Sequence, residues 1–504
     1  MTDEQKSRKS LTAQAFWLLI AKTLAFMFAF ALPVLLTRSL SQNEYGLFKQ
    51  LFLIITTAVA LLPLGFSMSA YYYLPRETDP DRRGQVVLNI LLFNLIIGGA
   101  ACLALIFWPG LIAQIFRDPA ITSRASLVGA VILLSLFSSV LETVAVANQE
   151  LRLATIFIVA AQLTKTVLLV AAAISFDSVD ALLYAALIHG LVQSAALLWY
   201  ASSRFPGFWR KFNWSLTVKQ VGYSLPFGLV GLLYTIQTDL HNYFVSNRFS
   251  AATFAVYSIG VAQLPFIGIL KESVSSVILP RVSYLQEQGQ TREIIVLLAQ
   301  ASRKLAAVII PVYVFLLVTG LEFLTFMFTG VYAASWPIFA INLTMLPLSL
   351  LEVDAVTRAY KSHRFFLVRL QIVLSIVNAF SLWFAISRFG LVGAISVVVG
   401  VNLILRVVLV LRFSRVLGAK PSDLKLFKDV GKVAIASVLA GLLCFLVRSL
   451  IMVNYSSPII ILAGCFLVFA TVYVGVILML GVATTDERDK VRRGFERLQN
   501  LVYD

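Results

Sequence analysis

The sequence predicts an all-α polytopic membrane protein with about fourteen transmembrane helices. Three observations support this prediction. Of the 504 residues, 59% are hydrophobic and only 13% are charged, whereas a soluble domain carries about 25% charged residues. Apolar runs long enough for a membrane-spanning helix recur along the whole chain. The 41 Lys and Arg residues outnumber 25 Asp and Glu and gather in alternate connections between the runs, as the positive-inside rule describes.

The apolar runs define the helices in order. A bilayer core about 30 Å thick needs about 20 mostly apolar residues per helix, and each run supplies that length. The predicted helices lie near residues 12–37, 45–73, 85–107, 122–147, 153–175, 179–201, 220–246, 251–279, 303–327, 335–357, 365–387, 390–411, 432–450 and 457–482. The first run follows a basic head but is too long for a signal-peptide core, so we expect it to remain as helix 1.

Basic residues in the loops set the orientation. With the N-terminus in the cytoplasm, most Lys and Arg residues fall in the cytoplasmic connections and in the tail after Thr485. The outer loops then hold Arg38, Arg117, Arg124, Arg248, Arg388 and Arg448. We therefore expect a multi-pass membrane protein with both termini in the cytoplasm. The net charge of +16 indicates attraction to anionic lipids, notably at residues 412–432 and in the tail, rather than to nucleic acid.

Residues 1–418 contain an internal duplication at an offset of about 210 residues. Its matching segments are Arg38–Phe48 with Arg248–Tyr257, Leu74-Pro75-Arg76 with Leu279-Pro280-Arg281, and Leu141-Glu142 with Leu351-Glu352. In both copies the Pro is expected to end its helix and the Arg to mark the inner surface. Helices 1–6 and 7–12 are therefore predicted to be two six-helix repeats.

An even number of helices per repeat makes both copies enter the membrane from the same side, which is the parallel-repeat arrangement of some transporters. We expect an N-lobe at residues 1–205 and a C-lobe at residues 206–418, facing each other across a central cavity. Residues 419–504 would add two extra helices and the cytoplasmic tail. Alternating access by rocking of the two lobes follows from this arrangement as a hypothesis.

Ionisable side chains near mid-membrane are the candidate functional residues, because each costs about 2.5–3.5 kcal/mol there on insertion scales. The deepest cations are Lys22, Lys165 and Lys271. Lys22 and Lys165 correspond to Leu232 and Leu374 in the second repeat, an asymmetry that favours a role in the cavity over a shared structural role. Lysines in a water-filled cavity suit an anionic substrate such as a phosphate. We predict that the three lysines bind substrate.

Three further ionisable residues are candidates for ion coupling or gating, namely Asp239, Glu272 and His189. A packing role is the competing interpretation for His189. Ionisable residues closer to either surface, where snorkelling or pairing is easy, are predicted to be structural. This group contains Glu142, Glu352, Asp354, Arg369 and Arg406 near the inner surface and Lys49 and Glu322 near the outer one.

Enzymatic and metal-dependent functions find no support in the sequence. Cys102, Cys444 and Cys465 all fall in apolar runs without metal-ligand spacing. No phosphate-binding loop of the Gly-x-x-x-x-Gly-Lys-Ser/Thr type occurs, which argues against an ATP-driven pump. His189, His241 and His363 form no recognisable catalytic arrangement. We expect no enzymatic activity, no bound metal and no cofactor.

Four stretches resemble the polysaccharide transporter, or lipid-linked oligosaccharide flippase, family of the multidrug/oligosaccharidyl-lipid/polysaccharide exporter superfamily. They are TRSLSQNEYGLF at 37–48, SLPFGLVGLL at 224–233, TDLHNYFVSNRFSAATFAVYSIG at 238–260 and VILPRVSYL at 277–285. Two positions depart from the family pattern: Ser41 stands where a Gly is usual, and so does Ala255. Asp239 matches the Asp of the family's helix 7.

The resemblance implies a flippase that exports polyprenyl-pyrophosphate-linked oligosaccharides across the plasma membrane for cell-surface polysaccharide synthesis, such as O-antigen, exopolysaccharide, capsule or a teichoic-type polymer. The headgroup would cross in the cavity, where the lysines would hold the diphosphate, while the lipid tail stays in the bilayer. Implied partners are the lipid-linked substrate, membrane lipids, a polysaccharide polymerase and glycosyltransferases. Two alternatives stay open: a flippase of the peptidoglycan lipid precursor, and an ion-coupled multidrug exporter of cationic compounds, which would need an acidic cavity.

Overall fold

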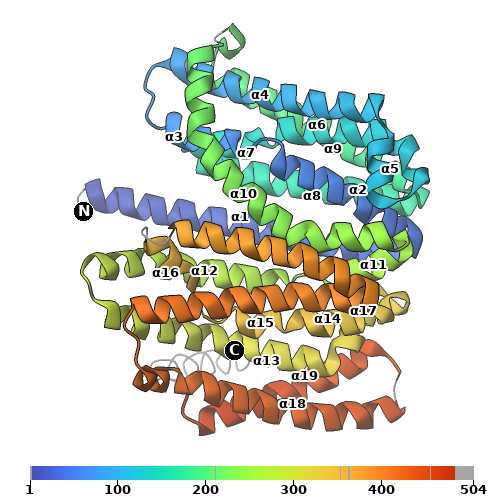
Figure 1. The fold of residues 1–504 in the computed structure, drawn as a ribbon, viewed down its shortest axis with the longest axis vertical. Coiled ribbons are helices and arrows are strands. Elements are labelled where there is room, and N and C mark those ends of the chain that lie inside the picture. The colour runs from blue at the N-terminus through green and yellow to red at the C-terminus, as the bar shows by residue number, and fades with distance from the viewer. Residues whose placement is uncertain (1–2, 211, 352, 361–363, 455, 483–504) are drawn as a thin grey trace, which may run out of the picture. The chain divides into compact units, whose positions relative to one another are not determined.

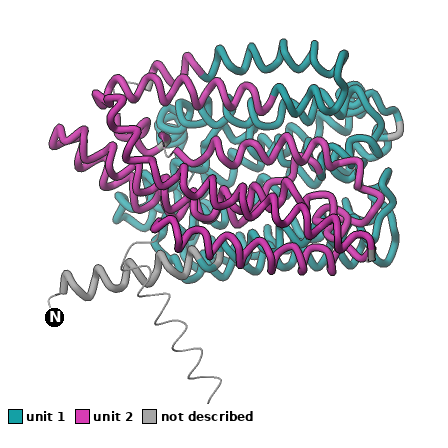
Figure 2. Tube along the Cα trace, turned by 90° about the horizontal axis from the view of Figure 1, so that it is seen from below, with its two compact units in different colours: residues 1–259, 371–397 teal, residues 260–370, 398–504 magenta. Residues whose placement is uncertain are grey.

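The computed structural model describes residues 3–210, 212–351, 353–360, 364–454 and 456–482. These residues form helices and no strand (Figure 1), which confirms the predicted all-α class. Contacts along the chain divide it into two compact units (Figure 2). Unit 1 comprises residues 1–259 and 371–397, and unit 2 comprises residues 260–370 and 398–504. Glu352 and the basic tail after Thr485 lie outside the described residues.

Unit 1 is built from the following helices: α1 Asp3–Ser39, α2 Gln42–Leu61, α3 Ser69–Tyr73, α4 Pro80–Phe107, α5 Gly110–Phe116, α6 Ala125–Ser138, α7 Val140–Ala147, α8 Leu151–Phe176, α9 Val179–Arg204, α10 Trp214–Arg248 and α11 Ala251–Gly260. Unit 2 is built from α12 Pro265–Glu287, α13 Thr291–Phe328, α14 Trp336–Leu343, α15 Met345–Leu348, α16 Val353–Ala359, α18 Lys428–Asn454 and α19 Pro458–Met479. Helix α17, Arg364–Val416, contributes residues to both units.

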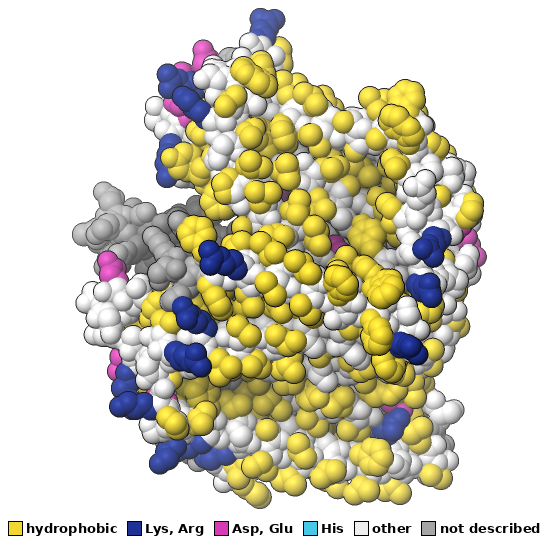
Figure 3. All heavy atoms as spheres, viewed as in Figure 1, with side chains coloured by type: hydrophobic (Ala, Val, Ile, Leu, Met, Phe, Trp, Pro, Cys, Tyr) yellow, Lys and Arg dark blue, Asp and Glu magenta, His cyan; other side chains and the backbone are white. Residues whose placement is uncertain are grey.

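Eleven helices of the described chain are long and apolar enough to cross a membrane, or twelve if the bent pair α11–α12 is one span. The predicted number of fourteen is therefore not confirmed. Two places account for the difference between twelve and fourteen. Helix α10 is not among the candidate spans, and α17 counts once although Gly390, with φ of 58° and ψ of −138°, interrupts it. On the face shown in Figure 3, side chains along the helices are mostly apolar and Lys and Arg lie toward the helix ends.

Polar caps and buried amides determine where the helices of unit 1 begin and how they pack. The Ser41 hydroxyl accepts a hydrogen bond from the Glu44 backbone N–H at 3.2 Å and so begins α2. The Asn213 side chain caps α10 in the same way, through Leu216 N–H at 3.0 Å. Buried Asn89 of α4 donates to the Gln220 side chain of α10 at 3.0 Å. This network ties the first half of α10 to α4.

The predicted helix at 45–73 is broken in the structure. Helix α2 ends at Leu61, and α3 begins only at Ser69 after a short 3-10 turn, η1 Phe66–Met68. Leu64 and Gly65 have φ of 45° and 71° at the break. Gly228 of α10 lies directly against it, since a Cβ there would be 1.9 Å from the Leu64 carbonyl oxygen. The close approach of α10 therefore requires a glycine at this position.

Two other predictions about helix ends have different outcomes. Pro75 lies just beyond the end of α3 at Tyr73, as predicted. The prediction that Pro280 ends its helix is wrong, because α12 continues to Glu287 with Pro280 inside it. A proline removes one backbone hydrogen bond, which membrane helices tolerate when nearby groups satisfy the freed carbonyl. The predicted helix at 335–357 is divided into α14, α15 and α16.

Helix α18 is held against α13 in unit 2 by a largely buried ion pair, and Arg448, predicted to lie in an outer loop, is within α18 near its C-terminal end. Arg448 of α18 donates to Glu322 Oε1 of α13 from Nε at 3.0 Å and from Nη2 at 2.6 Å. Both side chains are largely buried, 18% and 5% exposed respectively. Cys444 and Cys465 are buried where α18 packs on α19. The added helices are therefore attached by a charged contact as well as by apolar packing.

Candidate functional site

Lys165 lies in the middle of α8, a helix of 26 residues whose neighbouring positions are mostly apolar. Its side chain is half-buried, and its Nζ atom lies 5.9 Å from the centre of the Phe52 ring on α2. Among the described residues, no carboxylate lies within ion-pair distance of this ammonium group. A cation–π contact at this distance stabilises a cation by about 0.5–2 kcal/mol. The charge of Lys165 is therefore only weakly compensated within unit 1.

His189 of α9 lies within electrostatic range of Lys165. Its Nδ1 atom is buried and has no hydrogen-bond partner among the described residues. A buried ring nitrogen without a partner costs free energy unless water or a ligand satisfies it. Helices α8 and α9 pack against each other along their length, which brings these two predicted residues together. Lys165 and His189 thus form the centre of a polar site inside unit 1.

Lys49 of α2, predicted to have a structural role near the outer surface, lies one turn before Phe52. It is half-buried and precedes Phe52 by three residues, so both side chains lie on the same face of α2. No described carboxylate pairs with it. The next residue, Gln50, is 2% exposed and its Oε1 atom lacks a hydrogen-bond partner in the described chain.

Asp239 lies on the second half of α10 and contacts α2. Its Oδ2 atom accepts a hydrogen bond from the Thr57 hydroxyl at 3.4 Å. One turn further along α10, Tyr243 donates to the Leu53 carbonyl of α2 at 3.5 Å. Lys49, Phe52, Leu53 and Thr57 occupy successive turns of α2. Helix α2 therefore contacts Lys165 through Phe52, near its middle, and Asp239 through Thr57, nearer its C-terminal end.

His241 makes a closed pair that differs from the Asp239 contact two residues earlier. Its Nδ1 atom is 2.8 Å from the Tyr257 hydroxyl of α11, and both side chains are buried. Tyr257 as a whole is 0% exposed. This pair satisfies both polar groups and fixes the end of α10 to α11. It has the properties of a packing contact.

The remaining predicted residues are not brought into this cluster by the described contacts. Lys22 is exposed on α1 in unit 1. Lys271 is half-buried and Glu272 is exposed, both on α12 in unit 2. The division of Lys22, Lys165 and Lys271 between two units leaves their convergence on one cavity a prediction.

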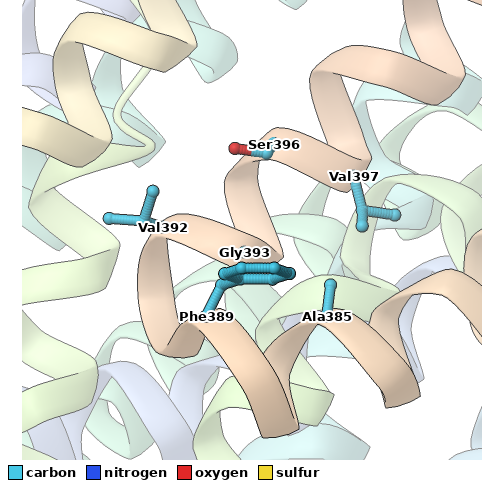
Figure 4. A pocket seen from close by; sticks show the side chains of 6 residues that line it. All are labelled: Ala385, Phe389, Val392, Gly393, Ser396 and Val397. Atoms are coloured by element: carbon cyan, nitrogen blue, oxygen red, sulfur yellow. The ribbon is translucent and has the colours of Figure 1, made fainter.

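A pocket of about 410 Å³ lies where α17 is interrupted, and it is unsuited to an anionic headgroup. Figure 4 shows its lining, which comes from both sides of Gly390 on the same helix. The lining residues are Ala385, Phe389, Val392, Gly393, Ser396 and Val397. Their only polar side-chain group is the Ser396 hydroxyl. The pocket offers no charge to hold a phosphate, so the polar site of unit 1 is the better candidate.

Apolar helices of membrane-spanning length that enclose ionisable side chains define a multi-pass membrane protein of the transporter class. The sequence profile of the family described as "Polysaccharide biosynthesis protein" matches residues 35–337. The chain belongs to this family, and the resemblance drawn from its motifs is confirmed. No curated protein matches the chain in sequence.

Solved structures show the same fold. A lipid II flippase MurJ in an inward closed conformation has a TM-score of 0.73 at 13% identity, covering 92% of this chain and 98% of its own. An inward-facing multidrug resistance MATE family transporter of the MOP superfamily has a TM-score of 0.60 at 15% identity, covering 78% and 95%. A MOP superfamily transporter from Pyrococcus furiosus has a TM-score of 0.53 at 16% identity, covering 82% and 96%. At these identities the likeness establishes the fold.

Proposed function

We propose that this protein is a flippase that moves polyprenyl-pyrophosphate-linked oligosaccharides across the plasma membrane during cell-surface polysaccharide synthesis. Membership in the polysaccharide biosynthesis family supports the pathway, and the transporter fold supports the type of activity. The observation that carries the proposal is the uncompensated Lys165 inside the membrane-spanning part of unit 1.

The chemistry of the substrate matches that lysine. A diphosphate carries about two negative charges, and an ammonium group about 4 Å away attracts each charge by about 4 kcal/mol at an effective dielectric constant of 20. Desolvation of both groups reduces the net value. Lys22, Lys165 and Lys271 are the proposed ligands of the diphosphate, and we add Lys49 to them because it lies one turn from Phe52 on α2. The polyprenyl tail would remain in the bilayer while the headgroup crosses by alternating access.

Asp239, Glu272 and His189 are the proposed residues for ion coupling or gating. Asp239 is tied to Thr57 by a single hydrogen bond of 3.4 Å, so its carboxylate keeps acceptor capacity for a proton or cation. His189 has an unsatisfied ring nitrogen beside Lys165, and protonation of the ring would add positive charge next to the proposed diphosphate site. Glu272 is exposed and next to Lys271 in sequence.

The two alternative functions make different demands on the site. An exporter of cationic drugs should expose more acidic than basic groups to its substrate, whereas Lys49, Lys165 and His189 give unit 1 a basic site. A flippase of the peptidoglycan lipid precursor would also use cations for the diphosphate, so only its sugar and peptide recognition would differ. The fold shared with MurJ leaves this alternative in place.

The proposed setting is the plasma membrane, with both termini in the cytoplasm and with a polysaccharide polymerase and glycosyltransferases as partners. Three exposed lysines, Lys420, Lys425 and Lys428, lie at or beside η6, Pro421–Phe427. In the proposed orientation they face anionic lipids of the inner leaflet.

Flipping in reconstituted vesicles tests the proposal. Vesicles would contain a polyprenyl-diphosphate oligosaccharide, and the fraction that crosses would be measured for the wild type and for a triple variant with Lys22→Gln, Lys165→Gln and Lys271→Gln. We expect near-complete loss in the triple variant, because Gln removes the charge and keeps much of the volume. Single Lys→Arg variants should keep partial activity, because the positive charge remains but a planar guanidinium replaces the compact ammonium group.

A matched triple variant, with Lys420→Gln, Lys425→Gln and Lys428→Gln, removes the same number of charges from the loop and should flip at close to the wild-type rate. Wild-type flipping by the variant lacking the three intramembrane lysines would refute the cationic site. Parallel assays with a peptidoglycan lipid precursor and with a cationic dye distinguish the alternatives.

A further inference from the structure

Four aromatic rings of unit 1 form a contiguous cluster where α3 meets the first half of α10. The Tyr72 and Tyr223 ring centres are 4.5 Å apart, and Tyr73 and Tyr223 lie edge to face at 6.1 Å. Phe227, one turn along α10, is 5.4 Å from Tyr223. The Arg76 guanidinium lies over the Tyr72 ring at 3.7 Å. We call Tyr72, Tyr73, Tyr223 and Phe227 the aromatic cluster.

The aromatic cluster is held in place by a buried hydrogen bond, and one of its rings, Phe227, is exposed. Gln220 of α10 donates to the Ser69 hydroxyl of α3 at 3.1 Å, and both residues are fully buried. This bond fixes the two helices that carry the rings. Phe227 is 53% exposed, so its ring surface is available for contact, whereas the Tyr72 ring is already covered by its contacts with Tyr223 and Arg76.

Polar groups lie beside Tyr71, the residue that precedes the cluster. Tyr71, adjacent to the cluster and 43% exposed, lies beside Thr143 and within electrostatic range of Glu142 of α7. Glu142 and Arg76 are themselves exposed. Aromatic faces combined with a carboxylate, a guanidinium and hydroxyl groups can bind a sugar ring, whose C–H face stacks on an aromatic ring while its hydroxyls form hydrogen bonds.

We infer that Tyr71 and Phe227, the two well-exposed rings that flank the covered Tyr72 ring, bind the sugars of the transported headgroup, with Glu142 and Arg76 as hydrogen-bonding partners. This inference rests on the proposed flippase function and names a saccharide subsite separate from the lysines. In the predicted topology Arg76 marks the inner surface, so the subsite lies where the headgroup would first enter.

The second repeat supports a specific role for these rings. Its Leu279-Pro280-Arg281 segment keeps the arginine, but Ser276, Val277 and Ile278 stand where the first repeat has Tyr71, Tyr72 and Tyr73. The repeat unit therefore forms without the three tyrosines. An aromatic belt at the membrane surface is the other explanation for exposed tyrosines, but a belt does not require a carboxylate and a guanidinium beside the rings.

Binding measurements on the purified full-length protein test the inference. Two probes would be compared: a polyprenyl diphosphate carrying a short oligosaccharide, and the same lipid without sugar. A double variant, Tyr71→Leu with Phe227→Leu, should bind the sugar-bearing lipid about tenfold more weakly, the product of two stacking contacts of ordinary strength. Its affinity for the sugar-free lipid should remain that of the wild type.

The controls separate ring stacking from folding. Tyr71→Phe with Phe227→Tyr keeps both rings and should bind within about twofold of the wild type, since the stacking surfaces remain. Tyr184→Leu removes another exposed tyrosine, on α9 of the same unit, and should change neither affinity. If the double variant does not fold, Phe227→Leu alone replaces it, because it exchanges one exposed apolar side chain for another.

Equal loss for both lipids, or no loss for either, would overturn the inference, as would a wild type that binds the two lipids equally. Flipping in vesicles is a separate readout. A wild type that prefers the sugar-bearing lipid through these rings but never flips it would refute the proposed function and leave the saccharide subsite standing.

Discussion

Each unit places a cation inside a membrane-spanning helix, and the two cations have different surroundings. In unit 2, Arg448 makes two hydrogen bonds to the 5%-exposed Glu322. In unit 1, Lys165 faces the Phe52 ring, has His189 nearby and pairs with no described carboxylate. A charged side chain is tolerated inside a protein or membrane when it is paired with an opposite charge, when it contacts water, or when it binds a charged ligand. The comparison therefore favours a structural role for the Arg448 pair and is consistent with the proposed substrate contact of Lys165.

The strongest test of this comparison is access to water. Cysteine at position 165 should react with a water-soluble thiol reagent, whereas cysteine at position 322 should stay inert, because only the first position is expected to line an aqueous space. Cys102, Cys444 and Cys465 would first be replaced by Ala. Mass spectrometry of labelled protein gives the readout. An inert cysteine at 165 in both open and closed states would make Lys165 a structural residue.

The next effect is on stability. Glu322→Gln should lower the free energy of unfolding by about 3 kcal/mol, because it leaves the Arg448 charge buried and unpaired. Replacing both residues, with Glu322→Met and Arg448→Met, should restore most of that loss, since no buried charge remains. Thermal denaturation in detergent measures both variants. Lys165→Gln removes an unpaired charge. If it destabilises the protein as much as Glu322→Gln does, the proposed difference in role between Lys165 and the Arg448–Glu322 pair is contradicted.

The smallest expected loss of stability comes from the neutral His241–Tyr257 pair. Tyr257→Phe removes the hydroxyl that lies 2.8 Å from His241 Nδ1 and should cost about 1 kcal/mol of stability, the ordinary value for one hydrogen bond. Flipping should be unchanged, because this pair is closed within unit 1. A loss of flipping without a loss of stability would instead place His241 among the functional residues.

The positions of the helices were predictable because membrane-spanning helices depend mainly on local composition. Each of the fourteen predicted intervals overlaps a helix of the structure. The break between Leu61 and Ser69 was not predicted, since it accompanies a contact with Gly228 from a distant helix. Pro280 illustrates the reverse error: a local helix-breaking signal was overridden within α12.

Site residues were predictable by type and depth but not by their partners. Lys165 and His189 stood out as ionisable groups in apolar runs, yet their proximity depends on how α8 and α9 pack. Depth along a helix does not indicate which way a side chain faces, so the structural role predicted for Lys49 stays a prediction. The convergence of Lys22, Lys165 and Lys271 remains a prediction.

The contact between Gly228 and the Leu64 carbonyl also constrains how this sequence can diverge. A side chain at 228 would occupy the position of that carbonyl, so a relative carrying Ala or a larger residue there must have displaced the break in its second helix. Positions 64, 65 and 228 should therefore change together or not at all among close relatives. An alignment of the sequences of such relatives is sufficient to detect this covariation.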